Sequence, residues 1–309
     1  MKRDFLTLKD FTREELIEMI ELAIKLKRDR KENIDQTHFM KGKKVALVFE
    51  KSSTRTRVSF EVGVYELGGY PLFLSKNDIQ LGRGETIADT ARTLSRYVDM
   101  IMIRTFAHSK IEELAKYSSV PVINGLTDDF HPCQVMADVM TIYEKFGKFS
   151  GVKVAFIGDG NNMANSWMIG AAKFGMDFTL ACPKGYEAKK EVFEESQKIG
   201  KETGATIDIV YDPYEAVKGA DIIYTDVWAS MGQEAESEKR LKDFKGFQVD
   251  ANFMKSTGKN TYFMHCLPAH RGEEVSEEVL ESDMSIVFDE AENRLHAQKA
   301  IMVKLIKNR

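Results

Sequence analysis

The chemically richest stretch of this chain is Ser53-Thr54-Arg55-Thr56-Arg57, which places three hydroxyls and two guanidinium groups within five residues. It follows an apolar run at 45–49, typical of a buried strand, and precedes apolar residues at helical spacing. The first backbone N–H groups of a helix point outward without partners and favour an anion. The stretch therefore predicts a site for a phosphorylated small molecule, and plain helix capping by Ser53 is the structural alternative.

Three further segments carry chemically useful residues, and each follows an expected strand or opens an expected helix. They are Arg104 with His131-Pro132-Cys133-Gln134, the segment 226–232, and His265-Cys266-Leu267-Pro268. Ligands of open α/β sheets gather at the carboxyl ends of the strands, so these positions favour function. Taken singly, each also has a structural alternative: a surface arginine, a capping histidine, a solvated loop aspartate or a small buried cysteine.

The segment Gly158-Asp159-Gly160-Asn161-Asn162 begins like a glycine-rich dinucleotide fingerprint, but Met163 stands where the third glycine is needed. This departure weakens the hypothesis of a nicotinamide-dependent dehydrogenase. Asparagines at a helix start suit a carboxylate or amide ligand, with N-capping as an equal alternative. A non-catalytic sensor of an amino acid or phosphate also stays open, because a fold does not fix a function.

Alternating strand and helix patterns position these segments. Strands are expected at 45–49, 71–74, 100–103, 121–123, 152–157, 178–181, 207–211, 221–225 and 262–265. The pattern predicts an α/β protein of two domains, each a mainly parallel sheet flanked by helices, joined by interdomain helices. The expected limits are 1–133 for the first domain, 134–148 for the interdomain helix and 149–289 for the second domain, with a closing helix at 290–309 that packs back on the first.

Composition excludes several classes of function. A 309-residue chain with 43% hydrophobic residues has room for two cores, and its net charge of −4 offers no general field for nucleic acid. No apolar run is long enough for a membrane span and no secretory segment is evident, so a cytoplasmic protein is expected. Cys133, Cys182 and Cys266 lack metal-ligand spacing, which argues against a zinc site and a disulfide framework.

Together the motifs resemble the aspartate/ornithine carbamoyltransferase family, and within it the ornithine carbamoyltransferases. The resemblance covers nearly the whole chain, with these segments in the family's order and approximate spacing: S-T-R-T-R, R-T-F from Arg104, H-P-C-Q, G-D-G-N-N, D-V-W-A-S-M-G, F-M-H-C-L-P-A-H-R-G and E-N-R from Glu292. It implies transfer of the carbamoyl group from carbamoyl phosphate to the side-chain amine of L-ornithine, which gives L-citrulline and phosphate in arginine metabolism. It also implies no metal, no organic cofactor, and a homotrimer or an assembly of trimers.

The resemblance also implies roles for individual residues, with carbamoyl phosphate bound by the first domain and ornithine by the second. The residues implied at carbamoyl phosphate are Ser53, Thr54, Arg55, Thr56, Gln80, Arg104, His131, Gln134, Cys266, Leu267 and Arg294. Those implied at ornithine are Asn162, Asp226, Ser230, Met231 and Cys266. In relatives the part of the site around Gln80 is completed across a subunit interface. The Ser-Met-Gly segment favours ornithine over putrescine, a modified ornithine or aspartate.

The implied reaction fits these residue types. Attack of a neutral amine on the carbamoyl carbon builds negative charge on the carbamoyl oxygen and the departing phosphate, so preorganised donors are expected there. The catalytic candidates are Arg104, His131 and Cys266, while Arg57 either balances phosphate charge or is structural. The amine must first lose a proton, and both Cys266 and the leaving phosphate are candidates to accept it. Cys133 is expected to pack as a small apolar residue.

Overall fold

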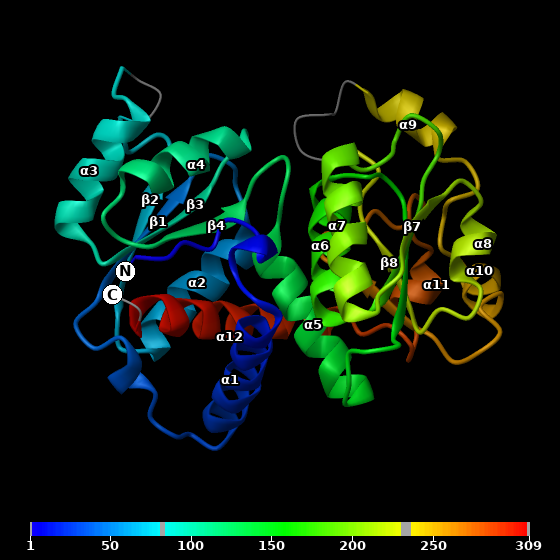
Figure 1. Cartoon of the computed structure of the whole chain (residues 1–309), viewed down its shortest axis with the longest axis horizontal. Helices are drawn as coiled ribbons and strands as arrows, with labels where there is room; N and C mark the ends of the chain where they lie inside the picture. Colours follow the sequence, from blue (N-terminus) through cyan, green and yellow to red (C-terminus); the bar gives the residue numbers. More distant parts are fainter. Residues whose placement is uncertain (1, 81–83, 230–235, 308–309) are drawn as a thin grey trace. The chain divides into compact units, whose positions relative to one another are not determined.

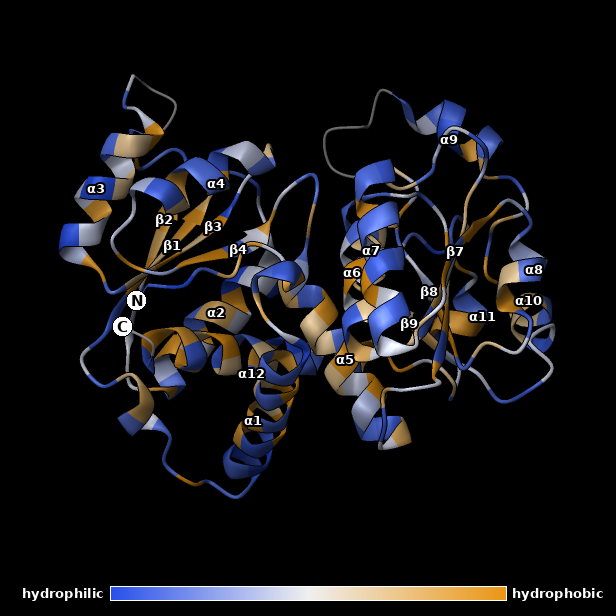
Figure 2. Cartoon of the chain, viewed as in Figure 1, coloured by the Kyte–Doolittle hydropathy of each residue, from blue (hydrophilic) through white to orange (hydrophobic). Residues whose placement is uncertain are grey.

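The computed structural model describes residues 2–80, 84–229 and 236–307, which form two compact units (Figure 1). The first unit comprises Met1–Met140 together with Glu292–Arg309, and the second comprises Thr141–Ala291. The chain passes from one unit to the other within α5 (Pro132–Phe146) and within α12 (Val287–Lys307). Each unit has its own parallel sheet, and the strands of both sheets are largely hydrophobic (Figure 2).

The first unit is built on a four-stranded sheet in the order β2-β1-β3-β4, with every neighbouring pair parallel. Its strands are β1 (Lys44–Phe49), β2 (Tyr70–Ser75), β3 (Met100–Arg104) and β4 (Val122–Leu126). Its complete helices are η1 (Leu8–Asp10), α1 (Arg13–Lys31), η2 (Thr37–Phe39), α2 (Thr54–Glu66), α3 (Ile87–Tyr97) and α4 (His108–Tyr117). The nearly continuous apolar runs of β1 and β3 are what a parallel sheet with both faces covered requires.

Helix α2 packs closely against α12, and a glycine permits this approach. A Cβ added to Gly63 would lie 3.2 Å from the Lys299 Cγ and 3.4 Å from the Leu295 Cδ1. The Lys299 ammonium also pairs with Glu66 at the end of α2, with Nζ and Oε2 2.6 Å apart. The stretch of α12 that belongs to the first unit is therefore held along the side of α2, whose first turn carries the predicted anion site.

The second unit contains a five-stranded sheet in the order β7-β6-β5-β8-β9, again with every neighbouring pair parallel. Its strands are β5 (Lys153–Ile157), β6 (Asp177–Ala181), β7 (Ile207–Val210), β8 (Ile222–Thr225) and β9 (Tyr262–His265). Its complete helices are α6 (Asn162–Phe174), α7 (Lys190–Thr203), α8 (Pro213–Val217), α9 (Ser237–Asp243), α10 (Ala251–Lys255) and α11 (Glu277–Leu280). Buried aromatic rings fill the space beside the central strands: Tyr224 lies 5.3 Å from Phe156 and 5.4 Å from Trp167 between ring centroids.

The predicted fold class is confirmed, because each expected strand occurs and the strands of each unit form one parallel sheet. Most strand limits agree with the expectation to within one residue, and two boundaries differ by three residues. Strand β4 continues to Leu126 rather than ending at 123, and the last helix begins at Val287 rather than at 290. Within the described residues, no helix combines the length and the apolar character needed to cross a membrane.

Candidate functional site

In both units the predicted site residues lie where the strand order reverses. In the first unit β2 lies on one side of β1 and β3 on the other, and Phe49 at the end of β1 pairs with Arg104 at the end of β3. In the second unit β6 lies on one side of β5 and β8 on the other. Loops that leave neighbouring strands in opposite directions open a crevice at this edge of a sheet. Each of the two positions is therefore the expected ligand site of its own sheet.

Thr56, in the first turn of α2, is the meeting point of the cluster in the first unit. Its Oγ1 accepts hydrogen bonds from Arg104 Nη1 at 3.4 Å and from Arg294 Nη2 at 3.2 Å. The Nη1 of Arg294 also donates to the Oε1 of Gln134. All four side chains are buried, with at most 6% of each residue exposed. The structure thus brings together four predicted residues from α2, β3, α5 and α12.

The remaining residues of the hydroxyl-rich stretch divide between capping and the open helix start. Ser53 caps α2, since its Oγ accepts the backbone N–H of Thr56 at 3.2 Å. Thr54 is exposed and Arg55 is half-buried in the same turn. The structural role expected for Ser53 is therefore present, and the residue whose N–H it caps, Thr56, is the one that both arginines contact.

Two residues lie apart from this cluster. The Arg57 guanidinium stacks 3.6 Å from the centre of the Phe73 ring and pairs with Glu61 at 3.1 Å between Nε and Oε1, which favours its structural alternative. Gln80 is exposed in the loop after β2, and in the part of the chain that the structure describes no hydrogen bond joins it to Thr56 or the arginines.

His131 lies buried just before α5, with 5% of the residue exposed. Loss of hydration lowers the pKa of His131 well below 6.5, and the positive charges of Arg294, Arg104 and Arg55 lower it further. The imidazole is therefore neutral near pH 7 and offers one N–H donor and one nitrogen acceptor. In this cluster the positive charge comes from the arginines, while His131 can supply a neutral donor.

Cys133 is inert in this environment. It is fully buried, its Sγ donates to the backbone oxygen of Asn124 at 3.3 Å, and burial raises the pKa of its thiol to about 12. The expectation that Cys133 packs as a small apolar residue is confirmed. Cys182 in the second unit is likewise buried, and burial raises its pKa to about 12. Cys266 alone of the three cysteines is partly exposed.

Asp226, directly after β8, organises the cluster in the second unit. Its Oδ2 accepts a hydrogen bond from Asn161 Nδ2 at 2.8 Å, and its Oδ1 accepts from Cys266 Sγ at 3.1 Å and from the backbone of Val227 at 2.8 Å. Cys266 lies beside Asp226 because Thr225 and His265 are paired at the ends of β8 and β9. Only 7% of Asp226 is exposed, so the second cluster presents a nearly buried negative charge.

Asn161 ties Asp226 to the start of α6. Its Oδ1 accepts the backbone N–H groups of Met163 and Ala164 at 2.9 and 3.2 Å, while its Nδ2 donates to Asp226. Asn162, the neighbour predicted to bind ligand, is the first helical residue and half-buried. Asn161 therefore both caps α6 and positions Asp226, and Asn162 follows it as the first residue of the helix.

Close packing explains one of the glycines before α6, and backbone conformation explains the other. A Cβ added to Gly160 would lie 2.1 Å from the backbone nitrogen of Ala188, and Gly158 has a φ of +148°. Asp159 pairs with Arg240 at 2.7 Å between Oδ2 and Nη1. Burial raises the pKa of Asp159, Arg240 counteracts this shift, and the charge of Asp226 adds to it. These roles account for the Gly-Asp-Gly turn without a dinucleotide.

The turn His265-Cys266-Leu267-Pro268 is fixed from within the second unit. The backbone N–H of Leu267, which has a φ of +57°, donates to His265 Nδ1 at 2.8 Å, and His265 Nε2 lies 3.1 Å from Glu274 Oε1. The backbone N–H of His265 donates to Glu290 at 3.0 Å. Leu267 is half-buried beside Cys266. Ser230 and Met231, also predicted at ornithine, lie outside the described residues.

Two groups of described residues bring possible metal-ligating atoms within 4.8 Å of one another: Asp226, His265 and Cys266, and His270, Glu273 and Glu274. In the first group both ring nitrogens of His265 have hydrogen-bond partners, and the Cys266 thiol donates to Asp226. In the second group Glu274 Oε1 accepts from the His270 backbone at 2.6 Å and faces His265. Hydrogen bonding explains both arrangements without a metal.

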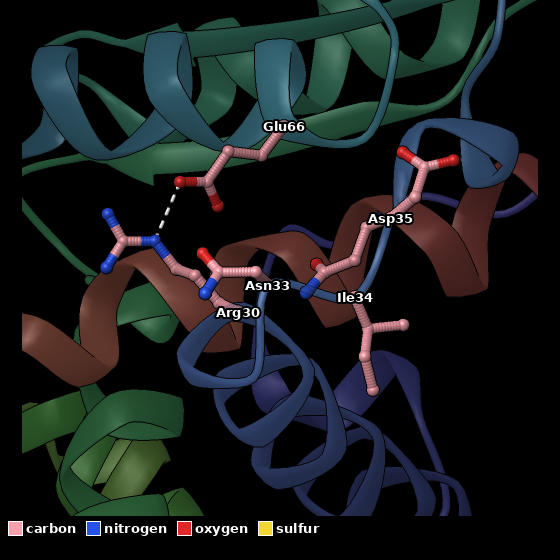
Figure 3. A pocket seen from close by; sticks show the side chains of 6 residues that line it. Arg30, Asn33, Ile34, Asp35 and Glu66 are labelled. Carbon is pink, nitrogen blue, oxygen red and sulfur yellow. Dashed lines mark hydrogen bonds and ion pairs between the residues drawn. The ribbon is translucent and has the colours of Figure 1, made fainter.

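A separate hollow of about 240 Å³ lies in the first unit between the end of α1 and the end of α2 (Figure 3). Arg30 and Glu66 pair across it, with Nε and Oε1 2.7 Å apart, and the Asp35 carboxylate accepts hydrogen bonds from Thr37. This pairing favours a structural role for the hollow over ligand binding. The residues that line it are Arg30, Asn33, Ile34, Asp35, Gln36 and Glu66.

Two family models match consecutive parts of the chain. The carbamoyl-P binding domain of aspartate/ornithine carbamoyltransferase matches residues 3–144, and the Asp/Orn binding domain matches residues 150–305. The chain belongs to the aspartate/ornithine carbamoyltransferase family. The family resemblance of the sequence motifs is therefore confirmed.

Individual members of this carbamoyltransferase family match over nearly the full chain. An ornithine carbamoyltransferase of Nitratiruptor sp. is 58% identical over 307 residues, which are 99% of each chain. The structure of ornithine carbamoyltransferase from Pyrococcus furiosus matches with a TM-score of 0.95 and 53% identity, covering 97% of this chain and 96% of that one. The anabolic ornithine carbamoyltransferase from Campylobacter jejuni matches with a TM-score of 0.93 and 44% identity, covering 99% and 100%.

Two residues that contact the clusters of this carbamoyltransferase were not predicted from the sequence. Asp138 accepts a hydrogen bond from Gln134 at 2.8 Å, and Asn161 binds Asp226. For Asp138 a signal existed, because it follows Gln134 by four residues in an expected helix and such pairs face each other. For Asn161 the capping position was noticed, but nothing in the sequence placed it beside a residue 65 positions later.

Proposed function

We propose that the protein transfers the carbamoyl group of carbamoyl phosphate to the side-chain amine of L-ornithine, producing L-citrulline and phosphate. The observation that carries this proposal is the convergence of Arg104 and Arg294 on Thr56 at the start of α2. Guanidinium groups and free helix N–H groups are the donors that a phosphorylated substrate needs. The acceptor is proposed from the relatives, which carry the name ornithine carbamoyltransferase.

The first unit is proposed to bind carbamoyl phosphate, with the phosphate at the start of α2 and the carbamoyl group beside the arginines. The residues proposed for the phosphate are Ser53, Thr54, Arg55 and Thr56. Those proposed around the carbamoyl group are Arg104, His131, Gln134 and Arg294, with Gln80, Cys266 and Leu267 completing the set. The buried hydrogen bonds from Arg294 to Thr56 and Gln134 support a preformed site for this substrate.

The arginines and His131 have different proposed tasks in the reaction. When the amine attacks, the C–N bond forms, the bond from the carbamoyl carbon to the phosphate oxygen breaks, and negative charge grows on the carbamoyl oxygen and the phosphate. Arg104 stabilises that charge with a fixed cation. Burial and the nearby arginines keep His131 neutral. It therefore donates a hydrogen bond, and the arginines alone supply positive charge to the phosphate group.

The second unit is proposed to bind ornithine through Asn162, Asp226, Ser230 and Met231. The nearly buried Asp226 carboxylate supports this assignment, since a buried negative charge is stabilised by a cationic partner such as an ammonium group. Asn162 lies at the start of α6, and because a helix N-terminus favours negative groups, this position supports its proposed contact with the ornithine carboxylate. The two ends of a zwitterionic amino acid thus have complementary partners in one unit.

The proton that leaves the ornithine amine has two proposed destinations, the Cys266–Asp226 pair and the departing phosphate. In the structure the Cys266 thiol donates to Asp226, so Cys266 accepts a proton only if its own moves onto the carboxylate. Cys266→Ser keeps a hydrogen-bond donor but removes the thiol. We expect lower turnover with nearly unchanged affinity for carbamoyl phosphate, and unchanged turnover would assign the proton to the phosphate.

The wider setting is also proposed: a cytoplasmic enzyme of arginine biosynthesis that needs no metal or organic cofactor and assembles as a homotrimer or from trimers. Exposed apolar residues support self-association, because Val58 and Tyr65 on α2 and Tyr70 on β2 are 52%, 75% and 63% exposed. Strand β2 is also an edge strand, which proteins commonly cover. Analytical ultracentrifugation tests the assembly, and a monomer at micromolar concentration would contradict it.

The decisive experiment is product formation from carbamoyl phosphate with ornithine, putrescine, N-acetylornithine or aspartate in parallel. Both the ureido product and phosphate are followed. Citrulline from ornithine, with little product from the other three, is the expected result. Phosphate release without a ureido product would leave the anion site standing and overturn the ornithine assignments, and product from aspartate alone would reassign the second unit within the same family.

A further inference from the structure

Asp138 is a buried carboxylate one helical turn beyond Gln134 on α5. None of its surface is exposed, and its Oδ1 accepts a hydrogen bond from Gln134 Nε2 at 2.8 Å. The other end of the Gln134 amide accepts from Arg294, whose second terminal nitrogen donates to Thr56. A chain of hydrogen bonds therefore runs from Asp138 through Gln134 and Arg294 to the first turn of α2.

The direction of this chain is fixed by which groups can donate. A guanidinium only donates hydrogen bonds and a carboxylate only accepts them, whereas an amide does one at each end. Gln134 must therefore turn its oxygen to Arg294 and its nitrogen to Asp138. A flipped amide would place two donors face to face at Arg294 and two acceptors face to face at Asp138. Asp138 thus selects one orientation of Gln134 from the side opposite to Arg294.

The packing of α5 does not itself require a carboxylate at this position. The neighbouring Val135, Met136 and Val139 are almost completely buried and apolar. A buried charge is costly unless it is paired, and apolar residues of similar size often stabilise such a site equally well or better. The carboxylate of Asp138 is therefore better explained by what it does to Gln134 and the cationic cluster than by stability of the helix.

We propose that Asp138 is a positioning residue for carbamoyl phosphate, holding Gln134 and through it the Arg294 guanidinium in their binding geometry before the substrate arrives. This inference rests on the proposed function, in which carbamoyl phosphate is the ligand of the cluster around Thr56. Asp138 does not touch the substrate. Its effect passes through the Gln134 side chain, and this dependence distinguishes it from a residue that merely supports the fold.

The test is a double-mutant cycle of Asp138→Ala and Gln134→Ala, measured as KM for carbamoyl phosphate, KM for ornithine, kcat and calorimetric binding of carbamoyl phosphate. Loss of one hydrogen bond involving a charged group weakens an interaction about tenfold to a hundredfold. We expect Asp138→Ala to raise KM for carbamoyl phosphate by this factor while KM for ornithine stays within about twofold. The double variant should be no worse than Gln134→Ala alone, because residues acting through one contact are not additive.

Two further variants separate positioning from folding. Asp138→Asn keeps the shape and an acceptor oxygen for Gln134 Nε2, so it should retain more affinity than Asp138→Ala and remains available if the alanine variant fails to fold. Asp29→Asn is the matched control, since Asp29 is also a nearly buried carboxylate of the first unit but pairs with Lys25. The control should leave KM for carbamoyl phosphate unchanged.

The outcomes distinguish this inference from the proposed function. If the wild-type protein forms no citrulline and does not bind carbamoyl phosphate, the proposed function fails. If the wild-type protein is active but Asp138→Ala and Asp138→Asn leave carbamoyl phosphate affinity unchanged, the positioning role is wrong. Full additivity of Asp138→Ala with Gln134→Ala would also overturn it. So would an Asp138→Ala variant in which the KM values for carbamoyl phosphate and ornithine rise equally and thermal stability falls.

Discussion

The two units place chemically opposite clusters on the same structural feature. In the first unit the reversal of strand order between β1 and β3 is occupied by Arg104 and by a helix start that Arg294 contacts. In the second unit the reversal between β5 and β8 is occupied by Asp226 and by a helix start that Asn161 caps. The backbone arrangement, including a helix start, is shared, so the difference in charge between the two sites comes from their side chains.

The titratable groups report this difference in sign. In the first unit burial lowers the pKa of His131, and three neighbouring arginines lower it further. In the second unit burial raises the pKa of Asp159, and the charge of Asp226 adds to the shift against the effect of Arg240. A site that repels an additional proton suits an anion, and a site that favours one suits an ammonium group. Beyond the larger effect of burial, the charge contributions to these two pKa shifts have opposite signs, which supports the proposal that the two substrates bind in different units.

The largest effect is expected from changing the geometry of the cationic cluster while keeping its charge. Arg104→Lys replaces a planar fork by a point charge that cannot reproduce both the contact with Thr56 and a directed donor for the substrate. We expect kcat to fall about 100-fold to 1000-fold, as for the loss of one preorganised donor. Steady-state kinetics with carbamoyl phosphate and ornithine measure this change.

Arg57→Lys is the matched control for Arg104. Arg57 belongs to the hydroxyl-rich stretch that also contains Thr56, but its side chain stacks on Phe73 and pairs with Glu61 outside the buried cluster. Its replacement should change kcat by less than about threefold, because exposed ion pairs contribute little. Equal losses in the two variants would show that the contact between Arg104 and Thr56 gives Arg104 no special role, and that the buried geometry at Thr56 is unimportant.

A smaller and substrate-specific effect is expected in the second unit. Asp226→Asn keeps the shape of the side chain but removes the charge proposed to bind the ornithine ammonium. We expect kcat/KM for ornithine to fall about tenfold to a hundredfold, the worth of a hydrogen bond to a charged group, while KM for carbamoyl phosphate changes little. Asp208→Asn, at an exposed position on β7, serves as the control. If KM for carbamoyl phosphate alone rose, the two substrates would not be divided between the two units as proposed.

Much of the fold was predictable because its signals are local. Apolar runs such as those of β1 and β3 mark buried parallel strands wherever they occur, and their alternation with helical patterns indicates two α/β units. The first turn of α2 was equally visible, since Ser53 and its neighbours are consecutive. Local patterns did not give the start of α12 at Val287, because the residue before it, Ile286, is not one of the usual N-capping types.

The contacts that complete each cluster join residues far apart in the sequence, so local sequence patterns did not reveal them. Arg294 reaches Thr56 across 238 residues, and only the family resemblance connected the two in advance. Asn161 and Asp226 meet because β5 and β8 are neighbours in the sheet, an order that the sequence does not state. Strand order is a property of the folded sheet, so residues joined by it are found only once the topology is known.

The smallest expected effect concerns stability in acid, and it tests how far burial and the nearby lysines keep His296 of the first unit neutral. His296 on α12 is buried, and its pKa is lowered to about 4 by burial and then by Lys299 and Lys27, although Glu292 counteracts them. Its unfolded form takes up a proton near pH 6.5, whereas the folded form stays neutral until about pH 4. Stability linked to His296 is therefore present above pH 6.5 and is lost as the pH falls towards 4.

His296→Gln removes the titrating group and keeps a neutral polar side chain, so the free energy of unfolding should depend less steeply on pH between 6.5 and 4 than in the wild-type protein. Urea unfolding at half-unit pH intervals measures the slope. His38→Gln, at an exposed position in η2, should leave the wild-type slope unchanged. Parallel curves for His296→Gln and the wild-type protein would mean that burial and the two lysines do not lower the pKa of His296 in the folded protein.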